Sequence, residues 1–347
     1  MRASRIRISL RVFLIATTIV ACVIGLFICR RLTERSADKS LVANGLSIAF
    51  SPWGGNGQYW AYDQEHERKD AVKTSIGRLK WNYFRHAKYV NGQRSAQLSD
   101  EPSNIGDTSL VPLEDLRHVE ILYLGFQPIS DEGLAHLQNL RSLNHLNLCG
   151  TKITDHGIAK LTMLSNLQYL AIEFTNVSDD GLQYVGQLQR LRDIYMMGTK
   201  ITGAGIKHIG ELTHLESLGL SDNPIHSDDL RHLTQLKKLK TLYLSDTEID
   251  DSAADYIAQL TALETLWVEN TKVGDKFLAG ISSLRELNNL NVKGTIITNA
   301  SEMAIRRFPQ LEQFYAYDTA MDYDTLDRVE VFTDANTETN LDRITKP

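Results

Sequence analysis

Leucine and other large apolar residues recur in this chain at a fixed interval of 24 residues. Aligned on their first apolar position, the units begin at Val119, Leu143, Leu167, Leu191, Leu215, Leu239, Leu263, Leu287 and Leu311. No insertion or deletion interrupts these nine units. Self-similarity at a short, constant period is typical of an array in which one structural unit stacks on copies of itself. The repeat therefore constrains the fold more than any single segment does.

Each unit has a strand-like half and a helix-like half. At Leu146, Asn147 and Leu148, apolar and polar residues alternate, which predicts a short strand with one buried face. Apolar residues three apart, such as Leu134 and Leu137, fit one side of a short helix. The second half of many units opens with Ser or Thr followed by Asp: Ser130 and Asp131, Thr154 and Asp155, Ser178 and Asp179. This pattern favours a capped helix start.

One unit alone cannot bury its apolar side chains. Stacking lets neighbouring units bury them, and each fully buried large side chain stabilises the fold by roughly 1.5–3 kcal/mol. The sequence therefore predicts an α/β solenoid, curved like a horseshoe. Its parallel β-sheet lines the concave face, and its short helices cover the convex face.

The unit resembles the leucine-rich repeat, whose signature is L-x-x-L-x-L-x-x-N/C-x-L. The continuation T-x-I-x-D-x-G-L-x-x-L is most similar to the cysteine-containing subclass of F-box proteins and many bacterial repeat proteins, including membrane-anchored ones. Asn223 keeps the family residue, whereas other units have threonine at this position: Thr151, Thr175, Thr199, Thr247, Thr271, Thr295 and Thr319. A threonine hydroxyl can bond to the turn backbone less completely than an Asn amide can. The resemblance implies a non-enzymatic binding scaffold.

The N-terminal segment differs from the rest of the chain. A basic flank, residues 1–11, precedes an apolar run from Val12 to Cys29, and this run is just long enough to cross a bilayer as a helix. A cleaved signal peptide would need a small-x-small site, which the end of the run lacks. A lipoprotein signal ending at Cys22 would leave an apolar start to the mature chain. An uncleaved single-pass transmembrane anchor explains both basic flanks, and we expect it.

Charge and cysteine content bear on where the repeats lie relative to the membrane and on which repeat proteins the chain resembles. The basic residues flanking the apolar run are balanced, so they do not orient it. A short N-terminal end more often stays in the cytoplasm, so we expect the repeats outside it, in the periplasm or at the cell surface. Outside the run Cys149 is the lone cysteine, which is more like bacterial than disulfide-capped animal or plant repeat proteins.

The formal net charge of the whole chain is −6. Residues 1–31 carry six arginines and no acid, so the remaining residues have a net charge of −6 − 6 = −12. This charge argues against a nucleic-acid partner, which needs a basic patch.

The remaining boundaries follow from loss of the repeat pattern. Residues 30–44 are a polar linker, and residues 45–109 are an N-terminal cap region over the first unit. The repeat domain spans residues 110–332 and begins with a half repeat at 110–118. The pattern degrades in the last unit, and residues 333–347 form a polar C-terminal tail.

Aromatic residues gather at the strand positions that should face the concave surface. The predicted partner-binding aromatics are Tyr123, Tyr169, Tyr195, Tyr243, Trp267, Tyr315 and Tyr317. Large aromatics on an exposed sheet are typical interface anchors. Aromatics also favour strands through β-propensity and ladder stacking, which is the alternative interpretation.

The same face is expected to carry acids, of which Glu173, Asp222, Asp246 and Glu269 complete the predicted site. An aromatic, acidic surface suits a basic protein or peptide partner. Two alternatives are an F-box-like adaptor for ubiquitin ligation, although residues 1–110 contain no F-box, and an envelope protein that binds glycan. No catalytic motif occurs, so we expect no enzyme activity, cofactor or metal. The oligomeric state is left open.

Overall fold

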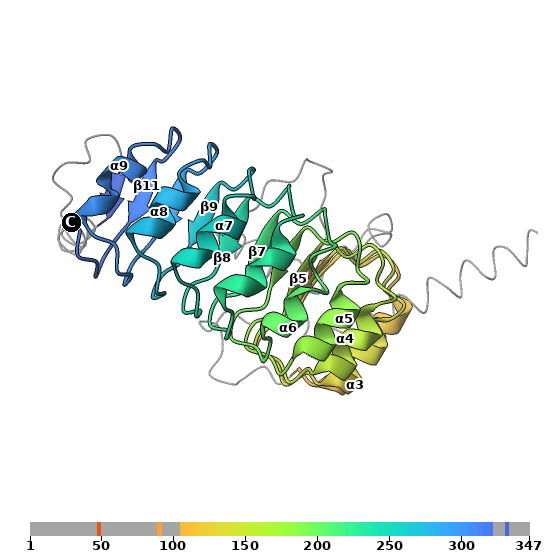
Figure 1. The fold of residues 1–347 in the computed structure, drawn as a ribbon. Helices are drawn as coiled ribbons and strands as arrows, with labels where there is room; N and C mark the ends of the chain where they lie inside the picture. The colour runs from red at the N-terminus through yellow and green to blue at the C-terminus, as the bar shows by residue number, and fades with distance from the viewer. Residues whose placement is uncertain (1–46, 50–88, 92–104, 322–329, 333–347) are drawn as a thin grey trace, which may run out of the picture.

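The computed structural model describes residues 47–49, 89–91, 105–321 and 330–332, and these form one continuous sheet with helices along one side (Figure 1). The strands, each three residues long, follow one another in chain order: β1 (Ser47–Ala49), β2 (Tyr89–Asn91), β3 (Ile121–Tyr123), β4 (His145–Asn147), β5 (Tyr169–Ala171), β6 (Asp193–Tyr195), β7 (Ser217–Gly219), β8 (Thr241–Tyr243), β9 (Thr265–Trp267), β10 (Asn289–Asn291), β11 (Gln313–Tyr315) and β12 (Glu330–Phe332).

Strands β3 to β11 are the strands of the nine repeat units, and they are parallel. Each residue pairs with the one 24 positions later, as Leu122 does with Leu146. The flanking strands do not follow this interval. Tyr89 of β2 pairs with Ile121 of β3, and Gln313 of β11 pairs with Glu330 of β12. Strand β1 then pairs with β2 antiparallel. The parallel solenoid predicted from the repeat is confirmed, with off-period strands extending both ends of its sheet.

Short helices lie on the opposite side of the repeats from the strands (Figure 1). They are η1 (Asp107–Asp115), α3 (Asp131–Leu134), η2 (Ala135–Leu137), α4 (Asp155–Leu161), α5 (Asp179–Val185), α6 (Gly203–Ile206), η3 (Ser227–Leu233), η4 (Asp251–Ala253), α7 (Ala254–Ile257), α8 (Asp275–Ile281), η5 (Asn299–Ser301) and α9 (Glu302–Ile305). Several are 3₁₀ rather than α-helical. The half repeat begins at Asp107, three residues before its predicted start.

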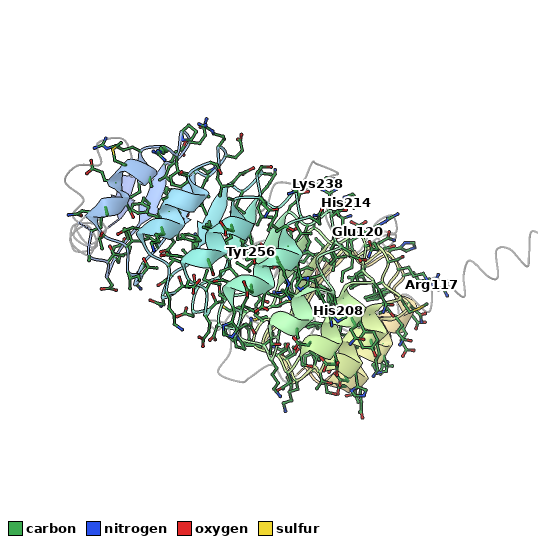
Figure 2. All side chains as sticks on the ribbon, viewed as in Figure 1. Arg117, Glu120, His208, His214, Lys238 and Tyr256 are labelled. Atoms are coloured by element: carbon green, nitrogen blue, oxygen red, sulfur yellow. The ribbon has the colours of Figure 1, made fainter. Side chains whose placement is uncertain are left out.

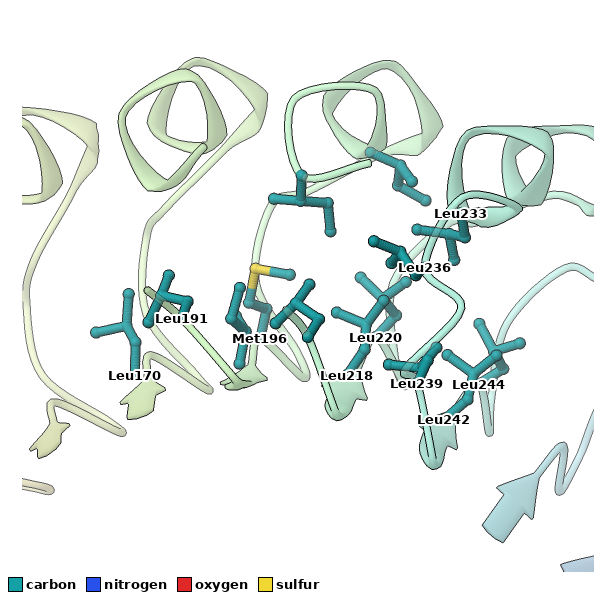
Figure 3. Packing of buried hydrophobic residues seen from close by; sticks show 14 of the residues in the cluster. Leu170, Leu191, Met196, Leu218, Leu220, Leu233, Leu236, Leu239, Leu242 and Leu244 are labelled. Atoms are coloured by element: carbon teal, nitrogen blue, oxygen red, sulfur yellow. The ribbon is translucent and has the colours of Figure 1, made fainter. Parts of the chain in front are cut away.

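The core is a continuous layer of leucine, isoleucine and valine between the strands and the helices (Figure 3). Leu218 and Leu242 project from the middle of β7 and β8, and Leu233 and Leu236 reach them from the helical side. All four side chains are buried. The core therefore runs along the whole array, so each unit depends on its neighbours for burial.

The aspartate at the start of many of the helices has a role that the cap pattern alone did not predict. Thr154 caps its own helix by accepting from the backbone N–H of His156 at 3.3 Å, as expected. Asp131, however, reaches the next unit, accepting from Thr154 N at 2.8 Å and Thr154 Oγ1 at 2.7 Å. Equivalent pairs join Asp107 to Ser130, Asp155 to Ser178, Asp179 to Thr202 and Asp275 to Thr298. These bonds form an aspartate ladder between units.

The aspartate ladder is interrupted in the middle of the array. Gly203 occupies the aspartate position, and the carboxylate of Asp229 lies where its Cβ would be. Asp229 accepts instead from the N–H of His226, within its own unit, at 2.9 Å. One unit later the roles reverse, because Ser227 Oγ donates to Asp250 at 2.9 Å and also accepts from Asp250 N at 2.9 Å.

The threonines that replace the family Asn each bond to their own turn. Thr151 Oγ1, for example, donates to Leu148 O at 2.6 Å. Asn223 does more, since its Nδ2 donates to three carbonyls and its Oδ1 accepts from Thr199 N at 3.2 Å. It thus joins two units, as expected from the greater bonding capacity of an amide.

Several sequence predictions lie outside the described residues. These are the basic flank 1–11, the anchor from Val12 to Cys29, the linker 30–44, the tail 333–347 and most of the cap region 45–109. Within the described part of the chain, no helix has the length and apolar character needed to span a bilayer.

Candidate interaction surface

The concave sheet carries an aromatic row, to which six of the seven strands from β3 to β9 contribute one residue each. We define the aromatic row as Tyr123, His145, Tyr169, Tyr195, Tyr243 and Trp267. Successive ring centroids are 5.1, 3.7, 5.5, 6.3 and 5.0 Å apart. The closest contact is the parallel stack of His145 on Tyr169. His145, which is not among the predicted site residues, fills the gap between Tyr123 and Tyr169.

A glycine makes the longest step in the aromatic row possible. Gly219 of β7 lies between Tyr195 and Tyr243, and a Cβ there would approach Tyr195 Cδ1 to 3.0 Å. The absence of a side chain lets the two rings approach each other across an intervening strand. The rings are half-buried, so ladder stacking accounts for part of the aromatic enrichment. Their remaining surface is open to the concave side, as are parts of Tyr315 and Tyr317 further along the sheet.

Next to the aromatic row, two polar groups lack hydrogen bonds. His145 Nε2 and Glu173 Oε2 are shielded from solvent and have no partner among the described residues. Burial lowers the pKa of His145 to about 4 and raises the pKa of Glu173 to about 7. Both shifts follow from desolvation, which disfavours the charged form of each group. A buried polar group without a partner is costly, and a bound ligand that supplied the bonds would remove that cost.

Nearby, Cys149 and Tyr195 are also shifted by their surroundings. Burial, with the negative charge of Glu173, raises the pKa of the Cys149 thiol to about 11. At neutral pH this cysteine is a protonated, weakly reactive thiol. Burial likewise raises the pKa of Tyr195 to about 12, so its hydroxyl remains a hydrogen-bond donor.

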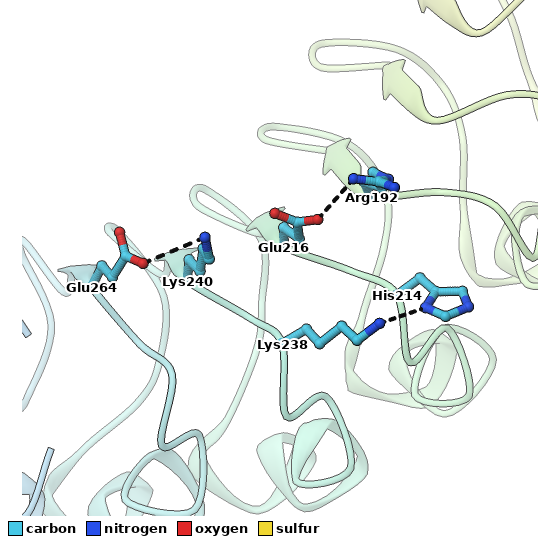
Figure 4. A network of polar contacts seen from close by, with 6 residues as sticks. All are labelled: Arg192, His214, Glu216, Lys238, Lys240 and Glu264. Carbon is cyan, nitrogen blue, oxygen red and sulfur yellow. Dashed lines mark hydrogen bonds and ion pairs between the residues drawn. The ribbon is translucent and has the colours of Figure 1, made fainter. Parts of the chain in front are cut away.

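Of the four acids predicted for the concave site, Glu269 is matched by a cation among the described residues, and so are two further acids of the sheet, Glu216 and Glu264. Glu269 lies 3.0 Å from Lys293. Arg192 lies 3.2 Å from Glu216, and Lys240 lies 3.6 Å from Glu264, so charges alternate along the strand starts (Figure 4). The partners in each pair are 24 residues apart in the sequence. The net negative charge of the concave sheet is therefore smaller than the number of its carboxylates alone would predict.

Asp222 and Asp246 lie beyond the strands, in the turn that follows each one. This turn holds one residue of every unit in the left-handed region, and we call these residues the turn row: Phe126, Gly150, Phe174, Gly198, Asp222, Asp246, Asn270, Gly294 and Asp318. Glycine, Asn and Asp adopt this conformation readily, whereas it costs other residues roughly 1–2 kcal/mol. Phe126 at φ 59° and Phe174 at φ 56° are therefore exceptional.

The convex side has a different character. Polar side chains surround the helices there, and Tyr256 lies among them (Figure 2). Its hydroxyl donates to Asp228 at 3.3 Å. Within the described residues, no cluster of His, Cys, Asp and Glu has the arrangement of a metal site.

Comparison with known proteins identifies the repeat. The family profile described as "Leucine rich repeat" matches residues 213–273. No curated protein matches the chain. Among solved structures, the internalins InlF and InlC2 of Listeria monocytogenes are 20% and 19% identical, with TM-scores of 0.46 and 0.45. Each alignment covers 65% of this chain, with 76% of InlF and 83% of InlC2.

The ectodomain of the Arabidopsis receptor kinase HAESA, solved with a peptide hormone ligand, is 17% identical with a TM-score of 0.51. That alignment covers 65% of this chain and 39% of the receptor. At this identity the likeness concerns the fold. The 24-residue unit, the parallel sheet and the family match at residues 213–273 agree with this likeness, and all of them support a leucine-rich-repeat fold.

Proposed function

We propose that this protein is a non-enzymatic, membrane-anchored scaffold that binds a protein or peptide on its concave face. The observation that carries the proposal is the aromatic row beside two unpartnered polar groups, His145 Nε2 and Glu173 Oε2. Aromatic rings offer a large contact area with little loss of conformational entropy. A partner that donated to Glu173 or bonded to His145 would also remove a desolvation cost that the free protein bears.

The fold supports binding of this kind by analogy. The HAESA ectodomain, which has a similar fold, was solved with a peptide on it. A rigid curved sheet does not have to order itself when a partner arrives, so less of the interaction energy is lost to entropy.

Membrane attachment is the second part of the proposal, and it rests on the sequence. The apolar run from Val12 to Cys29 holds the chain in the membrane, with the repeats outside the cytoplasm. Protease added to intact cells should then digest the repeats, while a cytoplasmic control protein survives. Protection of the repeats until the cells are lysed would contradict this orientation.

Affinity capture tests the binding site. The full-length chain in detergent would be compared with a Tyr169→Thr, Tyr195→Thr double variant, in which β-branched threonine, a residue that favours strands, replaces each tyrosine. The matched control is Tyr184→Thr on helix α5, on the convex side. One partner retained by the control and lost from the double variant would support the concave site. Equal capture by all three proteins would contradict it.

Salt distinguishes the kind of partner. Charge-steered protein association weakens as ionic strength rises, whereas stacking of sugar rings on aromatic side chains changes little. Retention of the captured partner at high salt, about 1 M, would point to the glycan alternative. Loss between low and high salt fits a basic protein or peptide.

A further inference from the structure

The turn row gives a reason to look beyond the concave sheet. Its left-handed backbone suits Gly, Asn and Asp, and seven of its nine members are of these types. Phe126 and Phe174 are not, yet neither side chain contributes to the core, because they are 69% and 53% exposed. The two phenylalanines therefore combine a strained backbone with an exposed apolar ring that lies outside the core.

Glycines in the next units make room for the two rings. A Cβ at Gly150 would lie 2.5 Å from Phe126 Cδ1, and one at Gly198 would lie 2.7 Å from Phe174 Cδ1. Each ring thus rests over the backbone of the following unit. Phe and Gly alternate over the first four units of the turn row. The turn row therefore presents two exposed aromatic rings, Phe126 in the first unit and Phe174 in the third.

The turn row becomes acidic in the units that follow these two rings. Asp222 and Asp246 occupy it in the fifth and sixth units, and both side chains are exposed. Neither forms an ion pair with a described residue, and Asp246 accepts only a neutral bond, from Asn270 Nδ2 at 2.9 Å. The sheet acids Glu216, Glu264 and Glu269, by contrast, are neutralised by nearby cations. Asp222 and Asp246 therefore present two exposed carboxylates in the turn row that no described cation neutralises.

The spacing along the turn row matches an extended peptide. Adjacent parallel strands are about 4.8 Å apart, so Phe126, Phe174 and Asp222, each two units from the next, are spaced at about 10 Å. A polyproline II segment rises about 3.1 Å per residue with three residues per turn. Every third side chain then lies on the same face, about 9 Å from the last. The two periods agree closely over three contacts.

We propose that the turn row binds an extended peptide segment with two apolar side chains three residues apart and a basic side chain three residues further on. The apolar side chains pack on Phe126 and Phe174, and the basic one pairs with Asp222 and Asp246. This inference rests on the proposed scaffold function and defines its ligand class. It also moves the specificity-determining contacts from the sheet to the turns at its edge.

Short synthetic peptides test the inference by fluorescence anisotropy with the full-length chain in detergent. The first peptide has leucine at positions three and six, arginine at position nine, and proline-rich spacers. A second replaces the arginine with glutamate, and a third moves the second leucine to position seven. We expect the first to bind at least tenfold more tightly than the other two. Equal binding of all three, or of none, would overturn the proposal.

The matched protein variant is Phe126→Asn, Phe174→Asn, because Asn270 already adopts this backbone conformation in the same row. We expect at least tenfold weaker binding of the first peptide, with a melting temperature that is unchanged or higher. A lower melting temperature would mean that the rings serve the fold, which would overturn the proposal.

Asp222→Asn, Asp246→Asn should abolish the preference for arginine over glutamate. If the preference remains, the acidic part of the proposal is wrong.

One further variant separates this inference from the concave-face proposal. Tyr169→Thr, Tyr195→Thr should change binding of the first peptide by less than twofold. If it abolishes binding while the phenylalanine variant does not, the ligand lies on the sheet and the turn row is overturned. If only the phenylalanine variant loses the peptide, the turn row is the site even where partner capture by the concave face fails.

Discussion

The first four repeat units and the last five differ in how they treat the polar groups of the concave face. In the first four, His145 and Glu173 are desolvated without bonds beside stacked rings. In the last five, Trp267 Nε1 donates to Asn289 Oδ1 at 3.1 Å, and Asn289 Nδ2 donates in turn to Gln313 at 2.6 Å. Glu269 is likewise satisfied there by Asn291 at 3.2 Å and by Lys293, whereas Ser245 Oγ is an exception.

If the protein binds a partner as proposed, the first half has more features that a ligand can use. Polar groups that bond to one another gain little from a ligand, since binding must first break or cover those bonds. The first half bears an unmet desolvation cost and two strained phenylalanines, and a ligand can relieve or use both. Four of the seven predicted partner-binding aromatics, Tyr243, Trp267, Tyr315 and Tyr317, lie in the second half. The geometry favours a centre around Tyr169 and Tyr195.

The helical side changes at the same place. The aspartate ladder is continuous through Asp179 and is interrupted at Gly203. Asn223, which bonds to both Thr199 and Met196, joins the two halves just where the ladder is absent.

Asn223→Ala should lower the free energy of unfolding by about 3 kcal/mol, because several buried carbonyls and N–H groups at the junction lose their partner. Urea unfolding of the full chain measures this. The matched control, Thr247→Ala, removes a single bond to Leu244 O and should cost about 1 kcal/mol. Equal losses would show that Asn223 is no more important to the junction than the threonines are to their turns.

Asp155→Ala should cost about 2 kcal/mol, since Ser178 loses two charge-assisted bonds of 2.7 Å between units. Asp180, which is exposed on the same helix, is the control, and Asp180→Ala should cost at most about 0.5 kcal/mol. Thermal unfolding compares the two variants. Similar effects would mean that helix charge matters and the aspartate ladder does not.

Glu173→Gln should stabilise the protein by about 1–2 kcal/mol at pH 8 and have little effect at pH 4.5. The pKa of Glu173 is raised to about 7, so between pH 4.5 and 7 the folded state holds a proton that the unfolded state has released. Stability contributed by this group is therefore lost as pH rises through that range. Denaturant unfolding at both pH values tests this, and a pH-independent gain would contradict it.

His145 should act with the opposite sign. Its pKa is lowered to about 4, so between pH 6.5 and 4 the unfolded state binds a proton that the folded state does not. Stability from this group falls as the medium becomes more acidic. His145→Phe, which can keep the stack on Tyr169, should flatten the acid side of the stability profile.

Lys240→Met should change the free energy of unfolding by at most about 0.5 kcal/mol, as is usual for an exposed ion pair. The pair that Lys240 forms with Glu264 is long, at 3.6 Å, and both side chains are substantially exposed. Denaturant unfolding would detect a larger loss. A loss well above this value would mean that the pairs of the second half hold the sheet together rather than merely neutralise it.

The 24-residue interval determined most of the fold from sequence alone. Because each strand is followed by the next one 24 residues later, the interval predicted which leucines are buried and which strands pair. It did not separate strand residues from turn residues, since Asp222 and Asp246 lie in the turns. It also held unused information. Arg192 and Glu216 are 24 residues apart, so their ion pair could have been predicted from the sequence. Gly, Asn or Asp occupies most positions of the turn row, so its positive φ angles could have been predicted as well. Phe126 and Phe174 stand out against that pattern.

Tertiary structure alone decided the features that cross units without following the interval. Strands β2 and β12 pair at other offsets, because the ends of the sheet are extended by segments outside the repeat. Asp229 fills the space left by Gly203, and His145 joins the tyrosines into a row. A periodic sequence specifies what every unit shares, because stacking imposes the same environment on each position. Where one side chain bonds, stacks or loses its water depends on its particular neighbours, and those meet only in the folded chain.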